Sequence, residues 1–207
     1  MPENLHKLFV ISSPSGGGKT SLINKVFEDS RSANFEKSIS DTSRQKRQGD
    51  LEGKDYYFLS EKDFKEKIKK EEYVEYATVF GNFYGTSKNE IKTKYNNSNL
   101  VLELDWQGAY AVKKLFDDAK LIFLVPPSLD DLKQRLIKRN LDSSESIENR
   151  LSEAKKEISK SEMYDFLVVN DDFDRAFEDL SQILFKGISS KDFNSRVSKD
   201  LIERLVE

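Results

Sequence analysis

The chain has 207 residues, of which 37% are hydrophobic and 11% aromatic, enough for one domain with a real core and too apolar for a disordered chain. Its 34 basic and 37 acidic side chains leave a net charge of −3, so we expect neither a nucleic-acid nor a membrane partner. With no cysteine and one histidine, disulfides and thiolate metal sites are excluded and a zinc site is not expected. No apolar run exceeds strand length and the N-terminus lacks a signal-peptide layout, which predicts a cytoplasmic protein.

Four apolar runs of strand length predict a parallel sheet that is covered on both faces, because such strands are hydrophobic on both sides. They are residues 8–11, 100–104, 121–125 and 166–169. Helical spacing of apolar residues is found in the segments 20–28, 109–116, 129–139, 147–160 and 174–186. This alternation of strand and helix predicts an α/β fold with right-handed crossovers.

Two stretches interrupt the alternation. Residues 34–97 are polar, with aromatic residues in short strand-like groups and one amphipathic segment at 61–70, and they predict a small, mainly β lobe. Residues 129–161 are highly charged and predict a helical insertion. We therefore expect a single domain over 1–207, whose core comprises about 5–33, 98–128 and 162–187, followed by a polar tail at 188–207.

A glycine-rich segment at 13–20 joins the first predicted strand to the first predicted helix. It matches the phosphate-binding pattern G-x-x-x-x-G-K-[ST], except that Ser13 stands at the first glycine position. Glycines let backbone N–H groups point at phosphate oxygens, Lys19 can bridge the β- and γ-phosphates, and the Thr20 hydroxyl can bind Mg²⁺. The expected phosphate-binding residues are Ser13, Pro14, Ser15, Gly16, Gly17, Gly18, Lys19 and Thr20. The alternative, a glycine-rich turn with an incidental lysine, does not account for the order strand, loop and helix.

The second core strand ends in Glu103 and Asp105, which are two residues apart and therefore project from the same face. A phosphate-binding loop needs a nearby carboxylate to hold its metal ion, and acidic side chains are seldom buried without a partner. We expect Asp105, together with Thr20, to bind Mg²⁺, partly through water. The alternative is that both acids lie on a solvent-facing edge.

The ordered set of motifs resembles guanylate kinase. It comprises the phosphate loop, Lys-Asp-Tyr-Tyr-Phe at 54–58, Gly-Asn-Phe-Tyr-Gly-Thr at 81–86, Asp-Trp-Gln-Gly at 105–108 and Pro-Pro-Ser at 126–128. The resemblance runs from about residue 7 to 186 and implies a P-loop nucleotide kinase fold with a parallel-sheet core, a GMP-binding lobe and a helical lid. It implies transfer of the ATP γ-phosphoryl group to GMP, giving ADP and GDP in purine nucleotide metabolism, with Mg²⁺ as cofactor.

The resemblance also implies how the lobe would bind GMP. The expected residues are Ser40, Arg44, Arg47, Asp50, Tyr56, Glu75, Tyr84, Thr86 and Glu103. The arginines and tyrosines would bind the phosphate and Asp50 would support the arginines. The two glutamates would accept from N1 and N2 of guanine and the two small hydroxyls would donate to O6, a pattern that adenine does not match. Taken alone, the arginines also fit a solvated basic loop, and Glu75 fits a surface position on a strand.

Arginines of the lid match family residues that close over the ATP phosphates. Because phosphoryl transfer depends mainly on positioning and fixed positive charge, no strong catalytic base is expected. The expected catalytic residues are Lys19, Arg44, Arg135, Arg139 and Arg150. Asn170, which follows the last core strand, resembles a family residue near the adenosine and joins the phosphate loop as an ATP-binding residue. Without the resemblance, lid arginines would be interpreted as ion-pair partners of neighbouring acids.

Three residues depart from the family pattern: Ser13 for glycine, Asp50 for glutamate and Glu103 for aspartate. Two other functions stay open, a non-catalytic guanylate-kinase-like protein-interaction module and a P-loop kinase for another nucleoside monophosphate. The intact Gly-Lys-Thr sequence and Asp105 count against the module, and Glu75 with Ser40 and Thr86 counts against another base. The pattern does not distinguish a monomer from a homo-oligomer.

Overall fold

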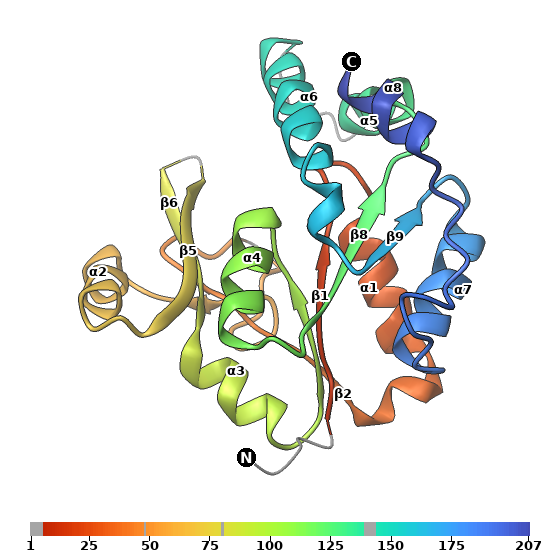
Figure 1. Cartoon of the computed structure of the whole chain (residues 1–207). Coiled ribbons are helices and arrows are strands. Elements are labelled where there is room, and N and C mark those ends of the chain that lie inside the picture. The colour runs from red at the N-terminus through yellow and green to blue at the C-terminus, as the bar shows by residue number, and fades with distance from the viewer. Residues whose placement is uncertain (1–5, 48, 80, 139–143) are drawn as a thin grey trace.

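Helices cover both faces of a five-stranded parallel sheet in the computed structural model of the chain (Figure 1). The structure describes residues 6–47, 49–79, 81–138 and 144–207. The strand order is β2-β7-β1-β8-β9, which places the first strand in the middle of the sheet. The strands are β1 (Leu8–Ser12), β2 (Phe35–Lys37), β7 (Asn99–Glu103), β8 (Lys120–Val125) and β9 (Phe166–Val169). The predicted α/β fold with a parallel-sheet core is confirmed.

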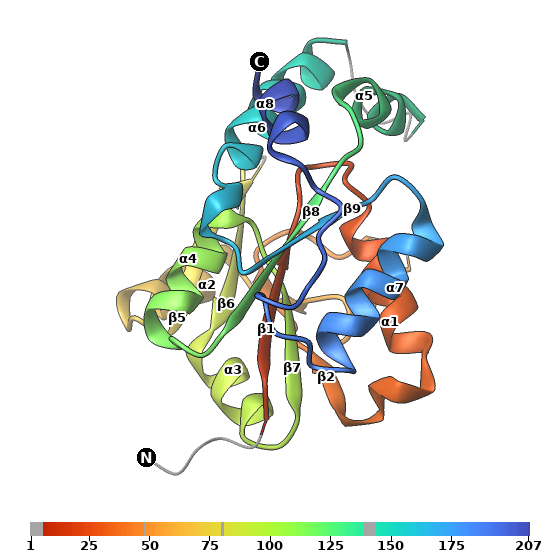
Figure 2. The same ribbon diagram turned by 45° about the vertical axis from the view of Figure 1, so that its right-hand side comes forward.

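The two faces of the sheet belong to two separate hydrophobic clusters, because successive side chains of a strand point to opposite sides. From β1, Phe9 and Ile11 pack with α1 and α7, whereas Leu8 and Val10 pack with α3 and α4. Figure 2 shows α1 and α7 together on one side of the sheet. The bounds of these helices are α1 (Lys19–Glu28), α3 (Lys88–Tyr95), α4 (Trp106–Leu115) and α7 (Phe173–Leu184). Burial on both faces explains why the core strands are continuous apolar runs in the sequence.

A second sheet, with strand order β4-β3-β6-β5, forms the lobe between β2 and α3. Its elements are β3 (Asp41–Thr42), β4 (Tyr57–Phe58), α2 (Glu61–Lys69), β5 (Tyr73–Val79) and β6 (Asn82–Ser87). Phe64 of α2 is fully buried, and its ring stacks on those of Tyr73 at 4.5 Å and Phe83 at 5.4 Å between centroids. The structure thus has an inserted, mainly β lobe with one helix, but this lobe is shorter than the predicted range 34–97, because β2 joins the core sheet and α3 packs in the core cluster.

Helices also gather beyond the carboxyl ends of β8 and β9 (Figure 1). They are α5 (Leu129–Lys138), α6 (Ser144–Ile158) and α8 (Lys199–Val206), of which α8 packs against α6. Among the described residues there are also two short 3-10 helices, η1 (Ser30–Asn34) and η2 (Ser161–Met163). Within the described ranges, no helix has the length and apolar character that crossing a membrane requires.

Two elements were not predicted from the sequence, β2 and α3. β2 has only three residues, Phe-Glu-Lys, none of them buried, and it lies at the edge of the sheet, so it has no apolar run to reveal it. α3 has two buried residues, Ile91 and Tyr95, in eight positions that are otherwise polar or charged. Tertiary packing rather than local sequence pattern makes α3 part of the core.

We predict that Phe64→Ala destabilises the protein by about 3–5 kcal/mol, because it removes a buried ring from the only helix of the lobe that the described structure contains. Phe173→Ala is the matched control, since Phe173 is 42% exposed, and it should cost less than about 1 kcal/mol. Urea unfolding of both variants measures the difference. Equal losses would contradict the assignment of Phe64 to the core of the lobe.

Candidate active site

The phosphate loop connects β1 to α1 through a backbone that requires glycine. Gly16 and Gly18 have φ of 87° and 88°, in the left-handed region that side chains disfavour. A Cβ on Gly18 would also lie 2.4 Å from the Asn170 amide nitrogen. The turn closes with Gly17 N–H donating to Pro14 O at 2.9 Å, and the hydroxyl of Ser13 donates to the same carbonyl at 3.1 Å. Ser13 therefore fits the loop in place of the usual glycine.

Lys19, the first residue of α1, points back toward the sheet. Its ammonium donates to the carbonyl of Leu104 at 3.2 Å. Burial lowers the pKa of Lys19, and the negative charges of Glu103, Glu157 and Asp105 oppose that shift. An ammonium held in this way at the start of the helix is a fixed positive charge next to the loop.

Glu103, at the end of β7, contacts both the residue that follows Lys19 and the edge strand β2. It accepts from the Thr20 hydroxyl at 2.5 Å and forms an ion pair with Lys37 at 2.8 Å. Burial alone would raise the pKa of Glu103, but the charges of Lys19 and Lys37 outweigh it and the pKa is lowered. The side chain is thus held as a carboxylate, with Thr20 and Lys37 as its hydrogen-bond partners.

Asp105 is the N-cap residue of α4, and its carboxylate accepts from the backbone N–H of Gly108 at 2.8 Å. Among the described residues, no three or more acids, histidines or cysteines are grouped as a metal cage. The hydroxyl of Thr20 and the carboxylates of Glu103 and Asp105 are nevertheless hard oxygen donors beside the loop. That set fits Mg²⁺, which keeps several waters and is bound through one or two carboxylates and substrate phosphates.

The predicted GMP-phosphate residues cluster around Arg44. Its guanidinium pairs with Asp50 at 2.8 Å and lies over the ring of Tyr56, 5.5 Å from the centroid. The rings of Tyr56 and Tyr84 are in edge contact at 5.7 Å. Asp50 also accepts from the backbone N–H of Arg47 at 2.8 Å, while the Arg47 residue is exposed. The carboxylate of Asp50 therefore contacts both arginine residues, the guanidinium of Arg44 and the backbone N–H of Arg47.

Three residues of the predicted base site come together from different strands. Glu75 of β5 pairs in register with Thr86 of β6, whose hydroxyl lies 3.3 Å from that of Ser40. Burial raises the pKa of Glu75 to about 7, against hydrogen bonding from Thr86. A carboxyl group beside two hydroxyls offers both acceptors and donors. Glu103, by contrast, contacts Thr20 and Lys37 rather than these three residues.

One cavity connects the phosphate loop with the lobe. Its volume is about 350 Å³, and residues from both regions line it: Lys19, Thr20, Lys37, Ser38, Ser40, Asp50, Asp55, Tyr56 and Glu103. Two of the predicted phosphate-loop residues, Lys19 and Thr20, and four of the predicted GMP-binding residues therefore face the same space.

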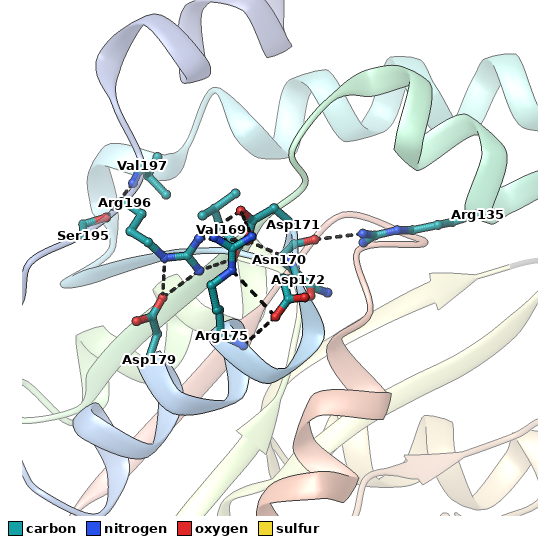
Figure 3. A network of polar contacts seen from close by, with 10 residues as sticks. All are labelled: Arg135, Val169, Asn170, Asp171, Asp172, Arg175, Asp179, Ser195, Arg196 and Val197. Atoms are coloured by element: carbon teal, nitrogen blue, oxygen red, sulfur yellow. Dashed lines mark hydrogen bonds and ion pairs between the residues drawn. The ribbon is translucent and has the colours of Figure 1, made fainter.

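Two of the predicted lid arginines contact the nucleotide-binding side of the sheet. Arg150 of α6 donates to the Ser15 hydroxyl of the loop at 3.0 Å. Arg135 of α5 donates to the backbone carbonyl of Asn170 at 2.8 Å (Figure 3). The Asn170 amide in turn donates to Gly17 O at 2.7 Å. Arg139 lies outside the described residues.

Sequence reasoning missed two residues of this region. Lys37 lines the cavity and pairs with Glu103, but it lies on the short edge strand β2 and no motif marks it. Glu157, near the end of α6, is half-buried, and burial raises its pKa to about 7 while Lys19 opposes the shift. It stands in a charged run, which in a sequence indicates a solvated helix face.

The family model described as Guanylate kinase matches residues 5–187. The chain belongs to this family. It is 44% identical to the guanylate kinase of Wolbachia sp. subsp. Brugia malayi (strain TRS) over 186 residues, 89% of this chain and 94% of that protein. It is 47% identical to the guanylate kinase of Hahella chejuensis over 178 residues, 86% and 85% of the two chains. The crystal structure of guanylate kinase from Anaplasma phagocytophilum superposes with a TM-score of 0.69 at 33% identity, covering 90% of this chain and 88% of that one.

The expected role of Glu75 at the guanine base, together with its raised pKa, predicts a pH-dependent affinity for GMP. The ionised carboxylate can accept from both guanine N–H groups, whereas the protonated group presents an O–H donor to one of them. With a pKa of about 7, the ionised fraction rises about tenfold from pH 6 to pH 8. We expect the KM for GMP to fall by a similar factor over this range. Glu75→Gln keeps an acceptor that does not titrate and should leave only the dependence of the GMP phosphate, whose second pKa is about 6. Identical profiles for both proteins would show that Glu75 does not read the base.

Proposed function

We propose that the chain transfers the γ-phosphoryl group of ATP to GMP, giving ADP and GDP. The observation that carries this proposal is the shared cavity, in which Lys19 and Thr20 of the phosphate loop face Ser40, Asp50 and Tyr56 of the lobe. A phosphoryl donor and an acceptor bound from these two sides would meet within one space. Membership of the guanylate kinase family supports the same conclusion.

On the ATP side, the backbone N–H groups of the loop and the N-terminus of α1 would hold the phosphates. Lys19 would leave the Leu104 carbonyl and bind the β- and γ-phosphates, which are stronger partners for an ammonium than a neutral carbonyl is. Arg150, which contacts Ser15 of the loop, and Arg135, which contacts Asn170, would add positive charge over the transferring group. Asn170 would contact the adenosine from the turn after β9.

On the GMP side, Arg44 would bind the phosphate while Asp50 holds its guanidinium in place. Tyr56 and Tyr84 would contribute hydroxyl donors. Glu75 would accept from the N–H groups of guanine, and Ser40 and Thr86 would donate to O6. This donor and acceptor pattern would favour guanine over adenine, because a mismatched base would leave buried groups unpaired.

Phosphoryl transfer depends more on the alignment of the two substrates than on proton transfer by a side chain. The GMP phosphate is already an anion at neutral pH, so an oxygen aligned with the γ-phosphorus suffices as nucleophile. Mg²⁺, held through Thr20 and Asp105, would neutralise charge on the phosphates of ATP. The side chains of this chain do the remaining work: they align the two phosphates, supply fixed cations and exclude water from the cavity. The cytoplasmic location stays a prediction from the sequence.

The activity test is ADP formation from Mg-ATP with GMP, AMP, CMP or UMP. We expect turnover with GMP alone, and Lys19→Ala should lower kcat by about 100-fold or more because it removes a fixed charge from the transition state. Lys25→Ala is the matched control, since Lys25 lies on the same helix with a 45% exposed side chain, and it should retain activity.

Turnover with another monophosphate would contradict the assignment of Glu75, Ser40 and Thr86 to the base. Folded protein that turns over none of the four would instead favour the non-catalytic interaction module.

A further inference from the structure

The last residues of the chain lie outside the part that the family model matches, 5–187, yet they reach the nucleotide-binding end of the sheet. Arg196, in the segment between α7 and α8, lies beside the turn of residues 170–172 that follows β9 (Figure 3). This turn includes Asn170, the proposed adenosine residue. The tail carried no functional signal in the sequence, so this placement is a property of the tertiary structure alone.

Arg196 uses its whole guanidinium to join the turn to α7. Its Nη1 donates to both carboxylate oxygens of Asp171, at 2.8 and 3.0 Å. Its Nε and Nη2 donate to Oδ2 of Asp179 at 3.2 and 3.0 Å, and Nη2 also donates to the carbonyl of Val169 at 3.2 Å. Burial would raise the pKa of Asp171, but hydrogen bonds from Arg196 outweigh it and the pKa is lowered. The planar, bidentate geometry is one that lysine does not provide.

The opposite side of the turn faces the phosphate loop. Asn170 donates from its amide to Gly17 O at 2.7 Å and from its backbone to Val125 O at 2.8 Å. Its carbonyl accepts from Arg135 of α5. The turn is thus bound on one side to the loop and to a lid arginine, and on the other to the tail. Arg175 also contacts Asp171, at 3.3 Å, but its side chain is 64% exposed and contributes little fixed geometry.

The tail itself is anchored firmly enough to position Arg196. The hydroxyl of Ser195 donates to the carbonyl of Leu167 in β9 at 2.7 Å and accepts from the backbone N–H of Val197 at 3.2 Å. Val197 packs against the hydrophobic cluster that contains Ile158 of α6, and Leu205 of α8, 1% exposed, belongs to that cluster. Arg196 therefore lies between two anchored elements, β9 and the helix α8 that packs on α6.

We propose that Arg196 is a positioning residue for ATP: it holds the 170–172 turn so that Asn170 stays against both the phosphate loop and the adenosine. This inference rests on the proposed function, in which Asn170 belongs to the ATP site. Except for Glu103, the predicted GMP-binding residues lie in the separate lobe, so losing Arg196 affects ATP and leaves GMP unchanged.

The experiment measures the KM for ATP and the KM for GMP separately in Arg196→Gln. We expect the KM for ATP to rise by about tenfold, the effect of losing one or two charged hydrogen bonds, with the KM for GMP within twofold of the original. Arg204→Gln is the matched control, because Arg204 is an exposed arginine of the same tail, and it should change neither constant. Calorimetric titration with β,γ-imido-ATP gives the same comparison without turnover.

Two further variants keep the test decisive if Arg196→Gln folds poorly. Arg196→Lys keeps the charge but cannot span the carboxylates of Asp171 and Asp179. Asp179→Asn weakens the contact of Arg196 with α7 without altering the 170–172 turn. Both should raise the KM for ATP by a smaller factor than Arg196→Gln does. A lowered melting temperature with an unchanged KM for ATP, or an equal rise in both KM values, would show a structural role only and overturn the inference. Lack of GMP phosphorylation by the unaltered protein would instead overturn the proposed function, while the imido-ATP titration would still test Arg196.

Discussion

The position of β1 in the middle of a parallel sheet is the constraint on which the site depends. Parallel strands bring their carboxyl ends to one edge, and the loop after the central strand therefore has neighbours on both sides. On one side β7 presents Glu103 to Thr20, and on the other the turn after β9 presents Asn170 to Gly17. The glycines matter for the same reason, because a side chain at Gly18 would occupy the place of the Asn170 amide.

Opposite charges are paired at several places around the site, on the core sheet and on the lobe. Glu103 is shared between Lys37 and the loop, Arg44 is held by Asp50, and the turn after β9 is held through its carboxylate at Asp171. A partly buried ion without a partner costs free energy, and each of these pairs avoids that cost. The pairing also holds each charged side chain in a fixed position. A phosphate entering the cavity then meets cations that are already oriented and loses little to their reorganisation. Glu75 and Glu157 differ from these pairs, since burial dominates at both and raises their pKa values to about 7.

Three parts of the chain that are far apart in sequence share this arrangement. The lobe contributes its residues from a separate sheet, the lid from α5 and α6, and the tail from the segment before α8. The tail packs on α6, whose Arg150 touches the loop, so lid and tail form one continuous body beyond β8 and β9. The tail is thus joined to the lid by packed side chains.

The sequence by itself determined the four long core strands, the phosphate loop, the mainly β lobe and the family, because apolar runs, glycine spacing and ordered motifs are local patterns. It did not reveal β2, α3, or the contacts of Lys37, Glu157 and Arg196, which stand in polar or charged runs that usually indicate a solvated surface. Glu103 shows the same limit: the family resemblance implies a base-reading acid, which stays a prediction, and no local pattern revealed that its partners are Thr20 and Lys37. Only the tertiary structure decides such pairings, because the partners are 66 or 83 residues apart in sequence and meet through strand order rather than through any local spacing.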